Sequence, residues 1–237
     1  MRIYKIALRV AVSLSLIVLI VLAIILVLTS SADQIAMDVL NEDYAKVENK
    51  VIILEPEEAV MNLVFYQGGL VQTEAYLVLL DALRDSGIRV FVPKMPLNLA
   101  ILNRQVIDEI YSNYGDDLPW VLMGHSLGGA TLSFVADERF EALIFLAAYP
   151  ANSEDLSTSN IKILSITASN DDVLNWDNFE NTKALLPEDT IFFSIEGGNH
   201  ANFGHYGKQR GDGEATITKQ QQISLTIEKI IKFLEID

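Results

Sequence analysis

Cysteine is absent from this chain of 237 residues, and histidine occurs only three times. Without cysteine there is no disulfide, no thiol nucleophile, no thiolate-ligated zinc and no iron–sulfur cluster. Three histidines leave little for a histidine-rich metal site, so we expect neither a metal nor a cofactor. Positive charge is also scarce, because 17 Lys and Arg oppose 32 Asp and Glu. The net charge of −15 argues against nucleic-acid binding, which needs clustered Lys and Arg.

Hydrophobic residues make up half of the chain, and their longest run lies near the N-terminus. Only two serines interrupt the run from Val10 to Leu28. As a helix, at about 1.5 Å per residue, this run matches the hydrocarbon thickness of a bilayer. Three positive charges precede it, at Arg2, Lys5 and Arg9. We therefore predict a single-pass N-terminal transmembrane helix, with the N-terminus in the cytoplasm and the remainder outside.

A cleaved secretory signal is the alternative, because Ser30, Ser31 and Ala32 provide small residues at a possible cleavage site. The apolar run is longer than the roughly 7–15 residues usual in a signal peptide, which favours a retained anchor. We accordingly predict residues 1–32 as a cytoplasmic stub with a membrane anchor, or an uncleaved signal. Residues 33–237 are predicted to form one extracytoplasmic domain, which is secreted if the N-terminal segment is cleaved.

Short apolar runs alternate with helical patterns through residues 33–237. Strands are predicted at 50–54, 60–66, 88–92, 120–123, 142–147, 161–166 and 191–195, and helices at 36–47, 73–84, 99–114, 126–136, 176–186 and 216–234. Nearly continuous apolar strands that alternate with helices are typical of a mostly parallel central sheet with helices on both faces. The predicted fold class is therefore α/β.

The sequence Gly124-His125-Ser126-Leu127-Gly128 lies between a predicted strand and a predicted helix. A serine at such a junction projects above the sheet, and small residues on either side allow the tight turn and close helix packing. Ser126 is therefore the candidate nucleophile. The alternative is a glycine-rich packing turn with an idle serine.

This motif and three other stretches resemble the α/β-hydrolase superfamily, and more narrowly a subgroup of small, lidless bacterial members that are often exported. The other stretches are Phe65–Gly69, Lys94–Ala100 and Gly197–Gly204. The resemblance covers nearly all of residues 33–237. It implies an α/β-hydrolase fold with no large lid and a carboxylesterase-like serine hydrolase with a Ser-His-acid triad.

A serine hydroxyl needs a base to take its proton. His200 follows the last predicted strand in a glycine-rich loop, where the superfamily places its base, and it is the predicted base. His205 is the fallback, whereas His125 lies inside the motif itself, where its backbone position prevents a productive approach.

The acid is expected between the serine and the histidine in chain order. Asp171 and Asp172 follow the strand predicted at 161–166. Relatives commonly carry Gly-x-x-Asp there, which favours Asp171, but Ala168 replaces that glycine and Asp172 stays open.

Two backbone N–H groups must bind the oxyanion that develops during acyl transfer. Leu127, directly after the nucleophile, and Gly69, in the loop after the strand at 60–66, are the predicted donors. We therefore expect a serine hydrolase that acts on a small-molecule carboxylic ester at the extracytoplasmic membrane face. An amidase or acyltransferase would use the same residues, and a catalytically silent binding protein of this fold is the alternative. The role of the segment from Tyr206 to Gly213 and the oligomeric state are left open.

Overall fold

The computed structural model describes residues 2–236, apart from the side chains of residues 2–9, 11 and 21. Within this part of the chain, one sheet has the strand order β1-β2-β4-β3-β5-β6-β7-β8. The strands are β1 (Ala45–Glu48), β2 (Val51–Leu54), β3 (Met61–Tyr66), β4 (Ile88–Pro93), β5 (Trp120–His125), β6 (Ala142–Leu146), β7 (Lys162–Ala168) and β8 (Ile191–Ile195). Pairing is antiparallel between β1 and β2 and between β2 and β4, and parallel from β4 to β8.

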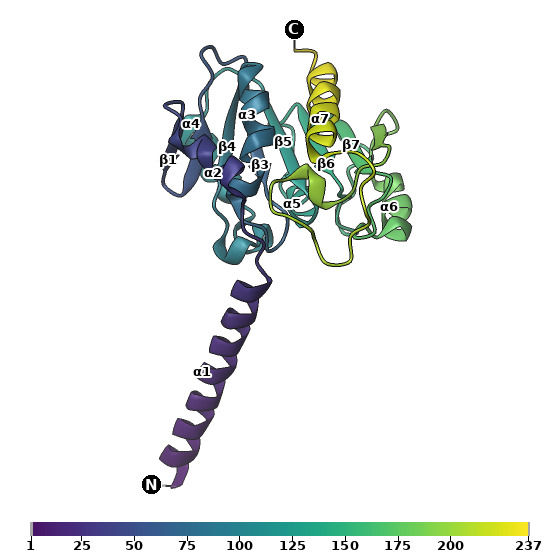
Figure 1. The fold of residues 1–237 in the computed structure, drawn as a ribbon. Helices are drawn as coiled ribbons and strands as arrows, with labels where there is room; N and C mark the ends of the chain where they lie inside the picture. Colours follow the sequence, from purple (N-terminus) through teal and green to yellow (C-terminus); the bar gives the residue numbers. More distant parts are fainter. Residues whose placement is uncertain (1, 237) are drawn as a thin grey trace.

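Helices cover both faces of this sheet (Figure 1). The α-helices are α1 (Arg2–Leu28), α2 (Gln34–Asp38), α3 (Leu77–Asp85), α4 (Val106–Tyr114), α5 (Leu127–Leu132), α6 (Trp176–Thr182) and α7 (Lys219–Leu234). One hydrophobic cluster joins the sheet to α3 and α7, and a second cluster joins the opposite face to α4 and α5. The predicted mostly parallel sheet with helices on both faces is confirmed.

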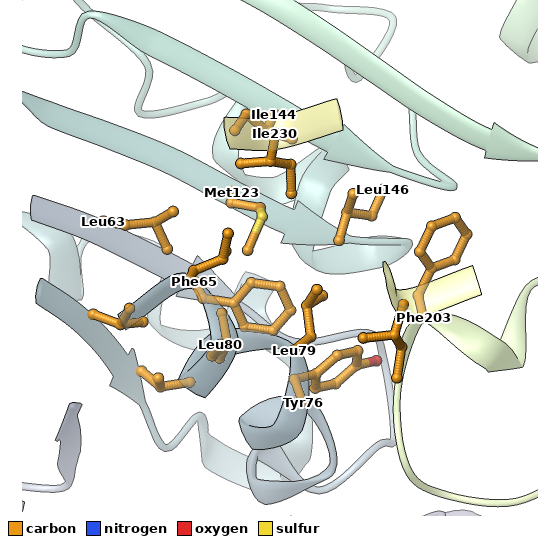
Figure 2. Packing of buried hydrophobic residues seen from close by; sticks show 14 of the residues in the cluster. Leu63, Phe65, Tyr76, Leu79, Leu80, Met123, Ile144, Leu146, Phe203 and Ile230 are labelled. Atoms are coloured by element: carbon orange, nitrogen blue, oxygen red, sulfur yellow. The ribbon is translucent and has the colours of Figure 1, made fainter. Parts of the chain in front are cut away.

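The central strands are buried along their whole length, which explains why they are apolar without alternation. Every residue of β3, β5 and β6 is buried, as expected for parallel strands that are covered on both sides. Figure 2 shows Phe65 of β3, Met123 of β5, Ile230 of α7 and Phe203 among the side chains of the first cluster. Phe203 matters for the site, because it fixes the loop after β8 to the core.

The helix predicted at 36–47 is wrong. The chain forms α2 and a short 3-10 helix that ends at Asn41, and then β1, which pairs with β2 through a two-residue turn. The turn residues Asn49 and Lys50 both have positive φ, 48° and 66°, as a type I′ hairpin turn requires. Lysine in place of the usual glycine hides this hairpin in the sequence. The other predicted helices all begin later or end earlier than expected, most clearly α5, which ends at Leu132, and α4, which begins only at Val106.

The predicted transmembrane helix is contradicted. Residues Arg2–Leu28 form α1, which extends away from the sheet in Figure 1, yet no helix among the described residues combines the length and the apolar content that crossing a membrane requires. Spanning takes about 20 consecutive apolar residues.

The predictions that rested on this helix are contradicted with it. They are the single-pass membrane location with an extracytoplasmic domain and the contact with a membrane through residues 10–28. The predicted orientation relied on the charges of Arg2, Lys5 and Arg9. The structure does not describe the side chains of these three residues.

The segment that follows α1 is attached to two loops of the domain. Ser30 pairs with the loop after β3, because its N–H donates to Leu70 O at 2.8 Å and its carbonyl accepts from Gln72 N at 3.0 Å. Asp33 pairs with the loop after β8, where its N–H donates to His205 O at 2.8 Å. The Asp33 carboxylate also lies 2.9 Å from His205 Nδ1. This short segment therefore connects two loops that are far apart in the sequence.

The Asp33 carboxylate should make stability depend on pH. Desolvation raises the pKa of Asp33, but hydrogen bonds from Ala36 N–H and His205 outweigh it and leave the pKa below 3.8. A lowered pKa in the folded state contributes stability above the unfolded value, and this contribution is lost as the pH falls through the folded value. Asp33→Asn should therefore reduce the free energy of unfolding at pH 7 by up to about 1 kcal/mol, since the side chain is 41% exposed.

Urea unfolding at pH 7 and at pH 3 measures this effect. The difference in the free energy of unfolding between wild type and Asp33→Asn should be smaller at pH 3 than at pH 7. Asp38→Asn, which changes an exposed carboxylate of the same helix, is the control. The prediction is contradicted if Asp33→Asn changes the free energy of unfolding by the same amount at both pH values.

Candidate active site

Ser126 lies between β5 and α5 in a strained backbone conformation. Its φ is 51° and its ψ is −124°, a region that residues other than glycine rarely occupy. The N–H of Ser126 donates to Leu146 O at 2.9 Å, so the end of β6 holds the turn. The turn places the serine where β5 ends and α5 begins, as the sequence predicts.

The glycines beside Ser126 are required by close backbone contacts. A Cβ added at Gly124 would lie 2.6 Å from Gly129 N, and one added at Gly128 would collide with the Tyr66 carbonyl oxygen. No side chain fits at either position without moving the backbone. The first turn of α5 therefore packs directly on the end of β3.

A buried hydrogen bond joins His200, after β8, to Asp171, after β7. Nδ1 of His200 lies 2.7 Å from Asp171 Oδ2, and the two side chains are 1% and 0% exposed. The other carboxylate oxygen of Asp171 accepts from Val173 N at 2.9 Å and from Leu174 N at 2.8 Å. When Nδ1 of His200 donates to this carboxylate, Nε2 is the ring nitrogen that is left to accept a proton.

Of the two aspartates that the sequence leaves open, Asp171 is the one that lies against His200. Asp172 is exposed. The sequence order Asp171-Asp172 thus places one carboxylate in the interior and the next at the surface.

Ser126 and His200 line the same cavity, which has a volume of about 250 Å³. Nε2 of His200 is buried and has no hydrogen-bond partner among the residues that the structure describes. The rest of the lining is mainly small or apolar: Leu127, Ala130, Ala147, Ala148, Tyr149, Val173, Leu174 and Asn175. A serine and an unpartnered imidazole nitrogen that share one cavity are suited to proton transfer during nucleophilic attack.

The other two histidines have different partners. His205, the fallback base, is paired with Asp33. His125 is fully buried, with Nδ1 2.8 Å from the Tyr76 hydroxyl and its ring centroid 4.5 Å from that of His200. Burial lowers the pKa of His125 well below its ordinary value. His125 is therefore neutral beside His200.

The loop from Gln67 to Val71, here called the oxyanion loop, lies against the start of α5. Its hydrogen bonds use the N–H groups of Gly68, Leu70 and Val71, which donate to Tyr76 Oη, Asn98 O and Gly68 O respectively. The N–H of Gly69 is not one of these donors. A Cβ at Gly69 would lie 2.9 Å from Leu127 Cδ2, so the backbone of Gly69 packs closely against Leu127.

Sequence reasoning missed Tyr76, which connects this loop to His125. Its hydroxyl accepts from Gly68 N at 3.2 Å and contacts His125 Nδ1 at 2.8 Å. Nothing in the sequence distinguishes it from an ordinary core tyrosine at the start of a helix. In the part of the chain that the structure describes, no group of three or more imidazole and carboxylate side chains is arranged to hold a metal ion.

Comparison with protein families gives one match. The family described as "Alpha/beta hydrolase family" matches residues 62–224, which include every residue of the site described above. Comparison with curated protein sequences finds no match.

Solved structures with similar folds share little sequence with this chain. MGS-MChE2, an alpha/beta hydrolase enzyme from a metagenome of lagoon sediments at Mar Chica, Morocco, has a TM-score of 0.60 and 20% identity, covering 81% of this chain and 100% of its own. Acyl-protein thioesterase 2 of Zea mays has a TM-score of 0.58 and 13% identity, covering 79% and 100%. The monoacylglycerol lipase of Paleococcus ferrophilus has a TM-score of 0.57 and 14% identity, covering 79% and 100%. These similarities show that the chain has the same fold as these proteins.

Removal of the Tyr76 hydroxyl should destabilise the fold. Tyr76→Phe leaves Gly68 N–H and His125 Nδ1 without their buried partner, and an unsatisfied buried polar group costs roughly 1–3 kcal/mol. We expect a loss of that size in the free energy of unfolding measured with urea. Tyr114→Phe is the matched control, because its hydroxyl bonds Glu48 at the exposed surface. Equal effects of the two substitutions contradict the prediction.

Proposed function

The chain belongs to the alpha/beta hydrolase family, and we propose that it is a serine hydrolase that cleaves carboxylic esters through an acyl-enzyme. The observation that carries this proposal is the buried Asp171–His200 hydrogen bond, whose imidazole shares a cavity with Ser126. The family match supports a hydrolase, and the arrangement of these side chains supports serine as its nucleophile.

In the proposed mechanism, Ser126 Oγ attacks the acyl carbon while His200 Nε2 accepts the hydroxyl proton. The carbonyl π electrons move to oxygen, and the resulting oxyanion accepts hydrogen bonds from Gly69 N–H and Leu127 N–H. Collapse of this intermediate breaks the bond to the alcohol oxygen, which takes the proton from His200. Water then attacks the acyl-enzyme by the same sequence and releases the carboxylic acid.

Asp171 has a separate part in this mechanism. It fixes the ring of His200 through Nδ1 and stabilises the imidazolium that forms, without taking the proton itself. The two backbone N–H groups that donate to Asp171 Oδ1 hold the carboxylate in its orientation. The acid, the base and the nucleophile thus come from the ends of β7, β8 and β5, which lie at one edge of the parallel sheet.

The size of the cavity favours a short acyl group. Its volume of about 250 Å³ lies below the ~300–1,000 Å³ of pockets that hold drug-sized ligands. Alanine occupies three of its lining positions, and Leu174 also lines it. Acyl groups of a few carbons fit such a cavity, whereas long lipid chains exceed it.

A fluorophosphonate probe tests the nucleophile. We expect the wild-type protein and Ser153→Ala, which changes an exposed serine, to be labelled, and Ser126→Ala to remain unlabelled. Ester hydrolysis should fall on the order of 10⁴-fold in Asp171→Asn, because that change stabilises the wrong tautomer of His200. A folded wild-type protein that neither reacts with the probe nor hydrolyses aryl esters refutes the proposal and favours a catalytically silent binding protein.

Acyl-chain preference tests the role of the cavity. Leu174→Ala should enlarge it and shift the ratio of kcat/KM for octanoyl over butyryl aryl esters upward by about tenfold, since each buried methylene is worth roughly 0.8 kcal/mol. Leu156→Ala is the control, because Leu156 is equally buried but lies outside this cavity. Both substitutions should destabilise the protein by ~2–5 kcal/mol, so the ratio and not the absolute rate is the readout. An unchanged ratio in Leu174→Ala shows that this cavity does not bind the acyl chain.

A further inference from the structure

Three backbone N–H groups converge on the carboxylate of Asp212. Its Oδ2 accepts from Ala201 N at 2.8 Å, and its Oδ1 accepts from His200 N at 3.2 Å and from Gly213 N at 2.9 Å. Two of these donors belong to the base loop, defined here as Gly197–Gly204, and one of them is the N–H of His200 itself. Asp212 lies in the segment from Tyr206 to Gly213, to which the sequence assigned no chemistry.

The opposite side of the base loop is held by Gln222, a fully buried residue of α7. Its side chain accepts from Asn199 N at 3.0 Å and donates to Asn199 O at 2.8 Å. The Asn199 side chain donates in turn to Gly213 O at 2.8 Å, directly beside Asp212. The residue before His200 and the residue after it are therefore both fixed by side chains from later parts of the chain.

These contacts hold His200 at two points. Its imidazole bonds to Asp171, and its backbone N–H bonds to Asp212. The ring is connected to the backbone by two rotatable bonds, so fixing both ends determines where Nε2 lies in the cavity. Hydrogen bonds to an ionised carboxylate are roughly twice as strong as neutral ones, which makes Asp212 the stronger of the two backbone clamps.

We propose that Asp212 is a positioning residue that sets the backbone of His200 and thereby the place of Nε2 relative to Ser126. This proposal rests on the serine hydrolase function proposed above. Asp212 acts through the base loop and does not touch the substrate. A displacement near 1 Å in a reacting group costs about 100-fold in rate, so loss of this clamp should be visible in turnover.

Steady-state kinetics with a butyryl aryl ester test the proposal. Asp212→Ala should lower kcat by about 10- to 100-fold while KM changes by less than about twofold, because the acyl cavity itself is intact. Asp212→Asn retains one acceptor oxygen and should recover part of the loss. Glu214→Gln is the matched control, because Glu214 lies two residues away, is 83% exposed and pairs only with Lys208 among the described residues. This control should keep the wild-type kcat.

Proton NMR supplies a readout that a purely structural role would not move. The Nδ1 proton of His200, bonded to Asp171, should give a downfield resonance in wild type and Glu214→Gln that shifts or broadens in the folded Asp212 variants. A kcat within twofold of wild type in Asp212→Ala, or an unchanged resonance in a folded variant, overturns the proposal. Should Asp212→Ala fail to fold, Asp212→Asn carries the same test. If wild type hydrolyses no ester, the proposed function fails, and the resonance alone decides whether Asp212 positions His200.

Discussion

Close contact between three backbone segments determines the geometry of the whole site. At the end of β5 the chain turns through the positive φ of Ser126 and enters α5, whose first residues pack on the carbonyl oxygens at the end of β3. This contact is possible only because Gly128 has no side chain. It brings Leu127 directly against Gly69, so the turn that exposes the serine also brings the two proposed oxyanion donors together. The positions of Ser126, Leu127 and Gly69 are thus consequences of one packing constraint.

A second constraint on the site is that a buried carboxylate must be fully hydrogen-bonded. Asp171 lies in the interior, where an ionised carboxylate is unfavourable unless it is fully hydrogen-bonded. Three donors satisfy it: His200 Nδ1 and the N–H groups of Val173 and Leu174. Among the described residues, the neighbouring His125 has the Tyr76 hydroxyl as its polar partner at Nδ1, and burial lowers its pKa and keeps it neutral. The three histidines therefore differ because each has a different hydrogen-bond partner: Tyr76 for His125, Asp171 for His200 and Asp33 for His205.

The sequence predicted the parallel core and the loops that carry Ser126, Asp171 and His200, because apolar strands of this kind end at one edge of a sheet. The prediction from sequence failed for the first strand of the sheet and for the N-terminal apolar run. The first strand of the hairpin, β1, falls partly within the helix predicted at 36–47, because its turn lacks glycine, and the apolar run from Val10 to Leu28 led to the wrong prediction of a membrane span. Tyr76, Asp212 and Gln222 were not found at all. Their contacts are side-chain hydrogen bonds to distant backbone groups, and no spacing rule in one sequence identifies such pairs.

The loops around the cavity are fixed mainly by such contacts. Tyr76 joins the oxyanion loop to His125, Asp212 and Gln222 hold the base loop, and Phe203 attaches that loop to the core (Figure 2). Electrostatic stabilisation of a transition state requires donors that are already in place, because reorienting them during the reaction costs free energy. The described residues form no helix or strand between β6 and β7 that could create this order by closing over the cavity. Hydrogen bonds between loops hold the donors in place instead. This explains why so many buried polar groups surround so small a site.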